Sequence, residues 1–391
     1  MLPITIWMNM PSFYQDDLFR ELSKKVDLRV VYDHVMTEDR RQLGWVESKK
    51  EYNSCILQVG HKVRQAVKIA RSEPGRVHII NGIWAEKAFA AAAIVLGWSG
   101  TPFAIYSERP DPIVSRGLLK RVARRSIGRW IARNANALFA ISHLATDYFS
   151  GLGFPPNRIY PFGYFRASPL ARAGELSTTC VGAKLDILYI GQLIRRKGLD
   201  ILMQAVKPLL YRYPKLQVSL VGSGIEQSIL DKEICNKELA DRIILEGVLP
   251  SNQVHLRLAR ASALILPSRW DGWGLVINEA FSAGVPVIAS DRCGAADLIV
   301  PGVNGYRFRS ESVDDLRDCL SAFVNSDQRQ MRAAALKTGI ALTIPVVSEY
   351  LVGCLEHMCG LRPSRPLAPW ETTLRELESE HGQPNSLHFG S

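Results

Sequence analysis

The feature that most restricts the fold of this 391-residue chain is a regular alternation of short, β-branched apolar segments with longer segments of helical character. Such alternation is typical of parallel sheets covered by helices, because each parallel strand needs a crossover connection. The sequence therefore predicts an α/β protein with two Rossmann-like domains. Its strands are expected at 4–8, 28–32, 77–80, 103–106 and 137–141 in the first half, and at 186–190, 217–221, 243–245, 263–266 and 287–289 in the second.

A break rich in Gly, Ser, Thr and Ala interrupts this alternation and divides the chain. We expect an N-terminal domain over 1–168, a linker over 169–184 and a second domain over 185–345. A C-terminal helix that crosses back to the N-terminal domain, followed by a loosely packed tail, is expected over 346–391. Two such domains leave a cleft at the carboxyl ends of their sheets, where ligands of this architecture bind.

Composition restricts the compartment and the partners. The seven cysteines form no C-x-x-C pair, which argues against a disulfide framework and a zinc site. The N-terminus does not resemble a signal peptide, and the longest apolar run is too short to span a membrane. We expect a cytoplasmic protein that is at most peripheral on the inner face of a membrane. Residues 1–170 hold 24 Lys/Arg against 14 Asp/Glu, so this half carries the whole net charge of +10.

The segment 269–289, RWDGWGLVINEAFSAGVPVIA, carries the strongest signal for chemistry. A strand ends before it, and the turn D-G-W-G at 271–274 opens a helix. Backbone N–H groups at such a turn favour an anion, and glycines allow a ligand to approach closely. Asp271 and Glu279 could both accept hydrogen bonds from a polyhydroxylated ligand. Taken singly, each carboxylate would more often be structural, Asp271 as a turn residue and Glu279 as a solvated helix residue.

This segment resembles the E-x₇-E region of retaining glycosyltransferases of family 4, E-G-F-G-L-x-x-x-E-A-x-A-x-G-x-P-V-I-A, with Asp in place of the first acid. The resemblance implies the GT-B fold, a nucleotide-diphosphate sugar as donor and retention of configuration. It implies that Glu279 holds the donor ribose and that Asp271 holds hydroxyls of the donor sugar. The donor contacts predicted at this turn are Gly272, Trp273, Gly274, Leu275 and Glu279.

A second motif, DILYIGQLIRRKGLDILMQA, places three consecutive cations after a strand that ends at Gly191. Cations at the carboxyl end of a strand suit a diphosphate, although an isolated basic loop is more often a solvated surface. Family 4 has G-R-L-x-x-x-K-G here, so the resemblance implies that Lys197 neutralises the leaving diphosphate. Gln192 stands where the family has Arg, and Arg196 (or Arg195) is the candidate replacement.

Weaker signals complete the predicted donor site. A V-G-S-G turn resembles one in family 4 and points to Gly222 and Ser223, and Val248 falls in the stretch beside the nucleotide base. The chain has no D-x-D pair, so we expect no metal and no resident cofactor. Cations and a helix terminus must then stabilise the leaving group.

The first half resembles the family only in outline. Tyr14 follows the first strand, and Ser107 and Glu108 end a later strand where many relatives place a histidine. We expect these three residues on the acceptor side or at the donor sugar. Between Arg116 and Arg133 the chain has seven Lys/Arg and no acid, with apolar residues at helical spacing. This stretch predicts an interfacial helix attracted to anionic lipid, a surface helix packed on its domain, or a helix that is both. The residues assigned to a membrane are Lys120, Arg121, Arg124, Arg125, Arg129 and Trp130.

The sequence thus predicts a metal-independent, retaining glycosyltransferase. It would move a sugar from a nucleotide-sugar donor to a glycan, lipid-linked or other acceptor in cell-surface polysaccharide or glycolipid assembly. Two alternatives stay open, a non-catalytic partner subunit that binds nucleotide sugar or membrane, and a nucleotide-sugar epimerase of the same fold. A nucleic-acid partner is not expected, because no recognition motif occurs and the basic stretch has one aromatic residue.

Overall fold

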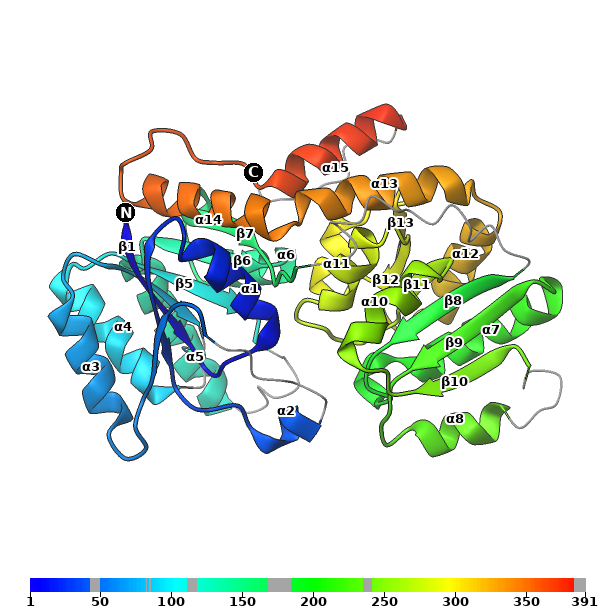
Figure 1. Ribbon diagram of the computed structural model, residues 1–391, viewed down its shortest axis with the longest axis horizontal. Helices are drawn as coiled ribbons and strands as arrows, with labels where there is room; N and C mark the ends of the chain where they lie inside the picture. Colours follow the sequence, from blue (N-terminus) through cyan, green and yellow to red (C-terminus); the bar gives the residue numbers. More distant parts are fainter. Residues whose placement is uncertain are drawn as a thin grey trace. The chain divides into compact units, whose positions relative to one another are not determined.

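The computed structural model describes residues 1–42, 50–81, 83, 86–110, 118–167, 184–234 and 241–382 (Figure 1). The chain forms two compact units. Unit 1 comprises Met1–Ala167 and Ile344–Pro369, and unit 2 comprises the described residues of Ser168–Thr343 and Trp370–Leu387. Each unit has its own sheet, and each is described below by itself.

Unit 1 is built on a seven-stranded parallel sheet of order β3-β2-β1-β4-β5-β6-β7. The central strands are almost completely buried, as expected for a parallel sheet that is covered on both faces. The order reverses between β1 and β4, which marks the switch point where ligands bind in doubly wound sheets. The strands are β1 (Pro3–Met8), β2 (Asp27–Tyr32), β3 (Asn53–Ile56), β4 (Val77–Asn81), β5 (Phe103–Glu108), β6 (Ala137–Ile141) and β7 (Ile159–Phe162).

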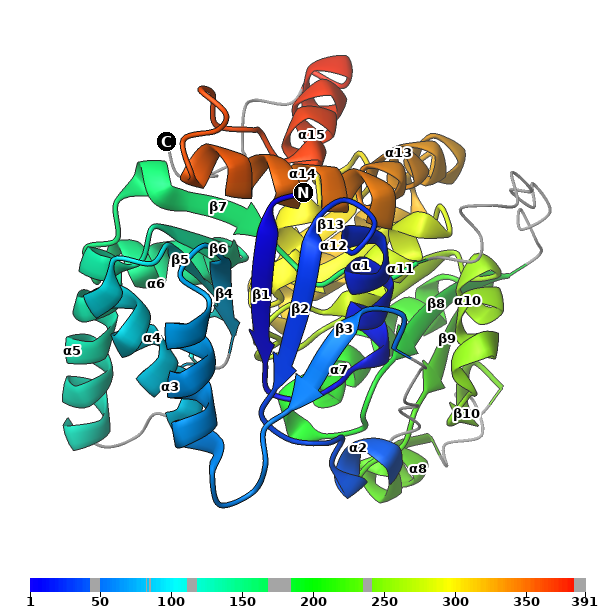
Figure 2. The same ribbon diagram turned by 60° about the vertical axis from the view of Figure 1, so that its left-hand side comes forward.

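Two sets of helices cover this sheet. α3 (Lys62–Ser72), α4 (Lys87–Ser99) and α5 (Leu118–Asn134) lie side by side on one face (Figure 2), and α6 (His143–Ser150) contributes to the same core. α1 (Phe13–Leu22) packs with α14 (Ile344–Met358), so a segment from the end of the chain belongs to unit 1. A short helix, α2 (Glu38–Gln42), follows β2.

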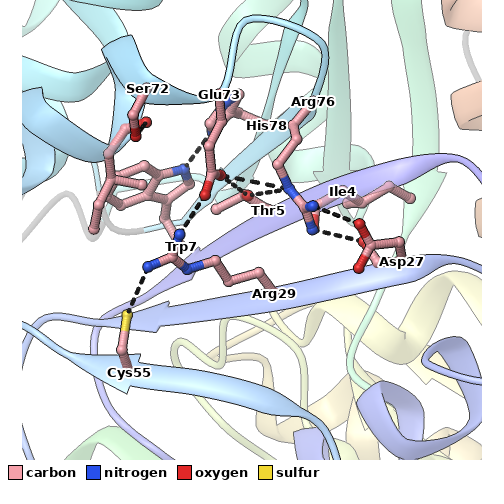
Figure 3. Close-up of polar contacts among 11 residues, drawn as sticks. Ile4, Thr5, Trp7, Asp27, Arg29, Cys55, Ser72, Glu73, Arg76 and His78 are labelled. Atoms are coloured by element: carbon pink, nitrogen blue, oxygen red, sulfur yellow. Dashed lines mark hydrogen bonds and ion pairs between the residues drawn. The ribbon is translucent and has the colours of Figure 1, made fainter.

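A polar cluster closes the amino-terminal edge of this sheet (Figure 3). Glu73 forms an ion pair with Arg29 and accepts a hydrogen bond from the Thr5 hydroxyl at 3.1 Å. On the same face, the buried indole of Trp7 donates to His78 Nδ1 at 3.0 Å. Burial and nearby arginines lower the pKa of His78 to about 4, so this imidazole is neutral at neutral pH. The cluster lies at the opposite edge from the carboxyl ends of the strands and is structural.

Unit 2 repeats the plan with a six-stranded parallel sheet of order β10-β9-β8-β11-β12-β13. Its switch point lies between β8 and β11. α7 (Leu199–Arg212) packs with α12 (Val313–Val324), and α11 (Leu275–Ser282) packs with α10 (Ser251–Ala259) and α13 (Gln328–Ala341). α8 (Gln227–Ile234) follows β9. The strands are β8 (Leu185–Ile190), β9 (Leu216–Val221), β10 (Ile243–Gly247), β11 (Ala263–Leu266), β12 (Val287–Ser290) and β13 (Gly305–Phe308).

The end of the chain differs from the loosely packed tail that its composition predicts. Pro369–Glu380 forms a helix, α15, that belongs mainly to unit 2. Trp370, Leu374 and Leu377 of this helix are almost completely buried. Their spacing of four and three residues places them on one helical face, which explains the tight packing despite many polar neighbours.

The prediction of two α/β domains with parallel sheets is confirmed, and each predicted strand is found within a residue or two. The prediction missed β3, β7 and β13, which are edge strands. Within the described residues, no single helix is long and apolar enough to cross a membrane. The bent pair α13–α14 passes that test by length and composition only.

Candidate active site

Two loops meet at the switch point of the unit 2 sheet. The loop after β8 contains the short 3-10 helix Arg195–Lys197, and the loop after β11 contains the turn 271–274. β8 and β11 are adjacent parallel strands, so their carboxyl ends bring these loops together. The Lys197 ammonium forms an ion pair with the Asp271 carboxylate, and both side chains are mostly buried. The two residues selected from separate motifs are therefore direct partners.

Backbone contacts hold the loop after β11 in place. Arg196 donates from Nη1 to the carbonyl of Trp270 at 2.7 Å, and the Arg269 N–H donates to the Arg196 carbonyl at 2.8 Å. On the other side, the Asp271 N–H donates to the Arg292 carbonyl at 3.0 Å. Arg196 thus uses one edge of its guanidinium to fix the turn that carries Asp271, and four N–H donors of its fork are not used in that bond.

Two glycines, Gly198 and Gly222, allow the loops to approach more closely than any other residue would permit. A Cβ on Gly222, whose φ is +139°, would lie 1.8 Å from the Gly191 carbonyl oxygen. A Cβ on Gly198, at φ +70°, would lie 2.1 Å from the carbonyl oxygen of Pro267. Such distances exclude a side chain, so the turns after β8, β9 and β11 form one close-packed backbone floor.

The turn at 271–274 opens α11 as predicted. Gly274 is the N-cap residue at φ +89°, and no side chain caps the helix. Glu279 is half-buried in the second turn of α11. Trp273 points into the domain instead of toward a ligand, because it is 4% exposed and its indole donates to Asn278 Oδ1 at 3.2 Å. Its ring fixes the turn, and only its backbone remains for a donor contact.

The other predicted donor contacts surround this floor. Gly191 and Gln192 follow β8, and the Gln192 carbonyl accepts a hydrogen bond from the Tyr189 hydroxyl at 2.7 Å. Ser223 is exposed in the turn after β9, and Val248 is 65% exposed after β10. All four lie at the carboxyl edge of the same sheet, where a ligand of such a fold is expected.

The carboxyl edge of unit 1 carries an aromatic cluster around Glu108. The ring of Tyr164 lies 5.6 Å from Tyr14 and 5.8 Å from Tyr106, centroid to centroid. Burial, followed by the charge of Glu108, raises the pKa of Tyr164 well above its usual value, so the phenol stays protonated. Ser107 is buried, and its hydroxyl donates to the Glu108 carbonyl at 2.8 Å. The structure thus brings Tyr14 and Glu108 together, and adds Tyr164, which sequence reasoning missed.

A second feature of that edge is a pocket of about 680 Å³ beside the end of β2. Asp33 and Glu86 line it, and burial and the neighbouring Asp33 raise the pKa of Glu86. Among the described residues, the ligand atoms of Asp33, His34 and Glu86 lie within 4.8 Å of one another, which is suitable spacing for a metal ion. Lys62 forms an ion pair with Asp33 and already supplies a positive charge there. No sequence motif reveals this cluster, because Glu86 is far from Asp33 and His34 in the sequence.

Residues 180–338 match the family Glycosyl transferases group 1. This range contains the loops that hold Lys197, Asp271 and Glu279, and nearly all of the described part of unit 2. Unit 2 is a glycosyl transferases group 1 domain. The family resemblance predicted from the D-G-W-G segment is confirmed at this level.

Curated relatives of the group 1 domain include several glycosyltransferases. The glycogen synthase of Mycobacterium tuberculosis is 24% identical over 77% of this chain and 72% of its own length. A GDP-mannose-dependent alpha-(1-6)-phosphatidylinositol monomannoside mannosyltransferase of Mycolicibacterium smegmatis is 27% identical over 55% and 59%. The uncharacterized glycosyltransferase MJ1178 of Methanocaldococcus jannaschii is 26% identical over 36% and 38%. The chain thus spans less than two thirds of the length of two of these three relatives.

Solved structures show the same fold beyond the group 1 domain. Anabaena Alr3699/HepE, in complex with UDP, gives a TM-score of 0.69 at 17% identity and covers 91% of this chain and 100% of its own. A glycosyltransferase from Rickettsia africae gives 0.70 at 12% identity, over 92% and 99%. The chain therefore has the GT-B fold of these glycosyltransferases, which confirms the predicted fold class.

The basic stretch 116–133 differs partly from its prediction. Trp130, assigned to a membrane, is half-buried and packs against the core of unit 1, with its ring 6.4 Å from that of Phe103 and in contact range of Gly97. Arg124 is half-buried, whereas Arg125 and Arg129 are exposed. The side chains of Lys120 and Arg121 lie outside the described part of the structure.

Proposed function

We propose that this protein is a retaining, metal-independent glycosyltransferase that uses a nucleotide-diphosphate sugar. The observation that carries the proposal is the Lys197–Asp271 ion pair at the switch point of the group 1 domain. A carboxylate that accepts sugar hydroxyls and an ammonium that donates to phosphate stand side by side there. The bond between sugar and diphosphate is the bond that such a pair would flank.

The charged side chains of this site can still bind a nucleotide sugar. An ammonium has three N–H donors, and Asp271 uses one of them, so Lys197 can also bind the diphosphate. The N-terminus of α11 at Gly274, which no side chain caps, adds backbone N–H groups that carry partial positive charge. Together they would stabilise the negative charge that develops on the leaving oxygen. Glu279 would accept the ribose hydroxyls, and Arg196 would hold the turn and offer its free edge to the diphosphate.

The reaction would proceed on one face of the sugar. The acceptor hydroxyl would attack from the side on which the diphosphate leaves, and the diphosphate oxygen would take its proton. The acceptor would be a glycan or a lipid-linked sugar held by unit 1, where Tyr14, Tyr164 and Glu108 offer an aromatic face and a carboxylate. Aromatic faces and carboxylates are common partners of polyhydroxylated ligands.

Calorimetric titration with UDP, GDP and ADP in EDTA tests the donor site. We expect one nucleotide to bind, and Lys197→Ala and Glu279→Ala each to weaken it by roughly 1–3 kcal/mol, as for the loss of a charged hydrogen bond. Lys215→Ala is the matched control, since Lys215 is exposed and precedes β9 at the opposite edge of the sheet. Binding that requires a divalent metal, or that is equal in all variants, would contradict the proposed site.

A further inference from the structure

Three neighbouring helices of unit 1, α3, α4 and α5, carry side-chain charge of a single sign. α3 contains four Lys/Arg, α4 one and α5 six, and none of the three helices contains an Asp or a Glu. The three helices lie side by side over one face of the sheet (Figure 2), and Gly97 of α4 is in contact range of Trp130 and Asn134 of α5. This layer therefore concentrates the excess positive charge of the first half on one side of unit 1.

Large apolar side chains are exposed on the same layer. Trp98 on α4 is 79% exposed, and Ile94, one turn earlier on the same helical face, is 39% exposed. On α5, Val122 is 56% exposed and Ile127 is 41% exposed. Single exposed apolar residues are ordinary, but Ile94 and Trp98 share one helical face of α4, and Val122 is exposed on the adjacent helix, an arrangement of the kind that marks an interaction site.

α5 is arranged to present both kinds of side chain outward. Ile131 and Gly128 face the core, where Gly128 packs on Leu152. The exposed residues at positions 122, 126, 129 and 133 follow one another at spacings of four, three and four, which places them on the opposite face of the helix. That face combines Val122 with two exposed arginines, Arg129 and Arg133.

We propose that this face of unit 1 docks on an anionic lipid bilayer. The docking surface, called here the Trp98 surface, consists of Ile94, Trp98, Val122, Arg125, Arg129 and Arg133. Its apolar side chains enter the boundary between headgroups and acyl chains, and its arginines meet the lipid phosphates. A tryptophan suits this position, because its ring is amphipathic.

The absence of acids on the three helices distinguishes a bilayer from a folded protein partner, which usually presents charges of both signs. A nucleic acid would need several aromatic residues for stacking, and Trp98 is the one exposed aromatic residue on the three helices in the described structure. Binding of this surface to a bilayer does not depend on the proposed function, but its consequence for the acceptor does. A glycosyltransferase docked in this way would act on a lipid-linked acceptor.

Sedimentation of the full chain with vesicles tests the Trp98 surface without any activity measurement. We expect binding to phosphatidylcholine vesicles that contain about one third phosphatidylglycerol, and little binding to pure phosphatidylcholine. Trp98→Ala should lower the partition constant roughly tenfold, as for the loss of one buried aromatic side chain. The triple variant R125E/R129E/R133E should lower it roughly a hundredfold or more.

Two matched controls separate this surface from general effects. Tyr211→Ala removes an equally exposed aromatic side chain from α7 of unit 2, where Tyr211 is 59% exposed. The triple variant R212E/K215E/R329E makes the same change in net charge on exposed positions of unit 2. Both should bind vesicles like the unaltered chain. No vesicle binding by the unaltered chain, equal losses in test and control variants, or binding only to RNA would overturn the proposal, while nucleotide titration would still report on the donor site.

Discussion

The two units have the same plan, but they build their ligand edges differently. In unit 2 the edge is a floor of backbone, in which Gly222 lies against Gly191 and Gly198 against Pro267. In unit 1 the edge consists of side chains, namely the tyrosines around Glu108 and the charged groups around Asp33. A backbone floor tolerates almost no substitution, whereas an edge made of side chains can change its chemistry and keep its fold. The comparison explains why one unit is recognisable as a family domain and the other only by its fold.

The largest effect is expected where the backbone floor is filled. Gly222→Ala should destabilise unit 2 by roughly 3–5 kcal/mol, because φ +139° is unfavourable for alanine and the new Cβ meets a carbonyl oxygen. Gly247→Ala is the control, because Gly247 also has a positive φ, +70°, but its Cβ would have open space. It should cost only about 1–2 kcal/mol. Denaturant unfolding of both variants measures this difference, and equal losses would refute the idea of a packed floor.

The next prediction concerns the pH dependence of unit 1. The pKa of His78 is about 4 in the folded state and is expected near 6.5 when the chain unfolds. The unfolded chain then binds the extra proton between pH 6.5 and 4, so the free energy of unfolding should fall across that window, by up to about 3 kcal/mol. His78→Asn, which keeps an acceptor for Trp7, should remove this contribution.

Hydrogen exchange resolved by segment is the appropriate measurement, since it reports on each unit separately. Protection should fall with pH in β1 and β4, and the variant should lose that dependence. The same dependence in unit 2, or its persistence in His78→Asn, would show that another group is responsible.

The smallest effect is expected at the aromatic cluster. Tyr164→Phe keeps the ring and removes the hydroxyl that bonds Glu108, so it should lower the rate of sugar transfer roughly tenfold, as for one hydrogen bond to a charged group. Nucleotide affinity should not change, because Tyr164 lies in unit 1. Tyr160→Phe is the control. The Tyr160 hydroxyl forms a hydrogen bond of 2.7 Å with His357 Nδ1, and this bond does not involve the aromatic cluster around Glu108. A loss of nucleotide affinity in Tyr164→Phe would remove the distinction between a donor unit and an acceptor unit.

The predicted donor site in unit 2 could be located from the sequence because its backbone geometry requires glycine at particular positions. Gly222, Gly198 and Gly274 cannot be replaced without a clash or strain, so their spacing is readable from one sequence. Two of the edge strands, β3 and β7, escaped detection for a related reason. β3 has the mixed residues Asn-Ser-Cys-Ile and is only half-buried, and β7 contains Pro161, which a central strand would not tolerate.

Other features depend on contacts between distant residues and could not be read from spacing. Glu108 and Tyr164 are 56 positions apart in the sequence, and Asp33 meets Glu86 only because β2 and β4 flank β1 in the sheet. The orientation of Trp130 depended on Gly97, where the missing side chain leaves room for the indole. A helical wheel of α5 alone could not show that.

The interleaving of the chain between the units bears on how such proteins evolve. Neither unit is a continuous stretch of sequence, because α14 belongs to unit 1 and α15 returns to unit 2. A single recombination event in the linker would therefore combine the first half of one ancestor with the α14 of a second ancestor. That α14 would have been selected to pack against the first half of the second ancestor. Successful exchange requires α14 to travel with α1, its packing partner. We expect exchange of acceptor units among relatives to leave paired crossovers, one before β8 and a second around α14.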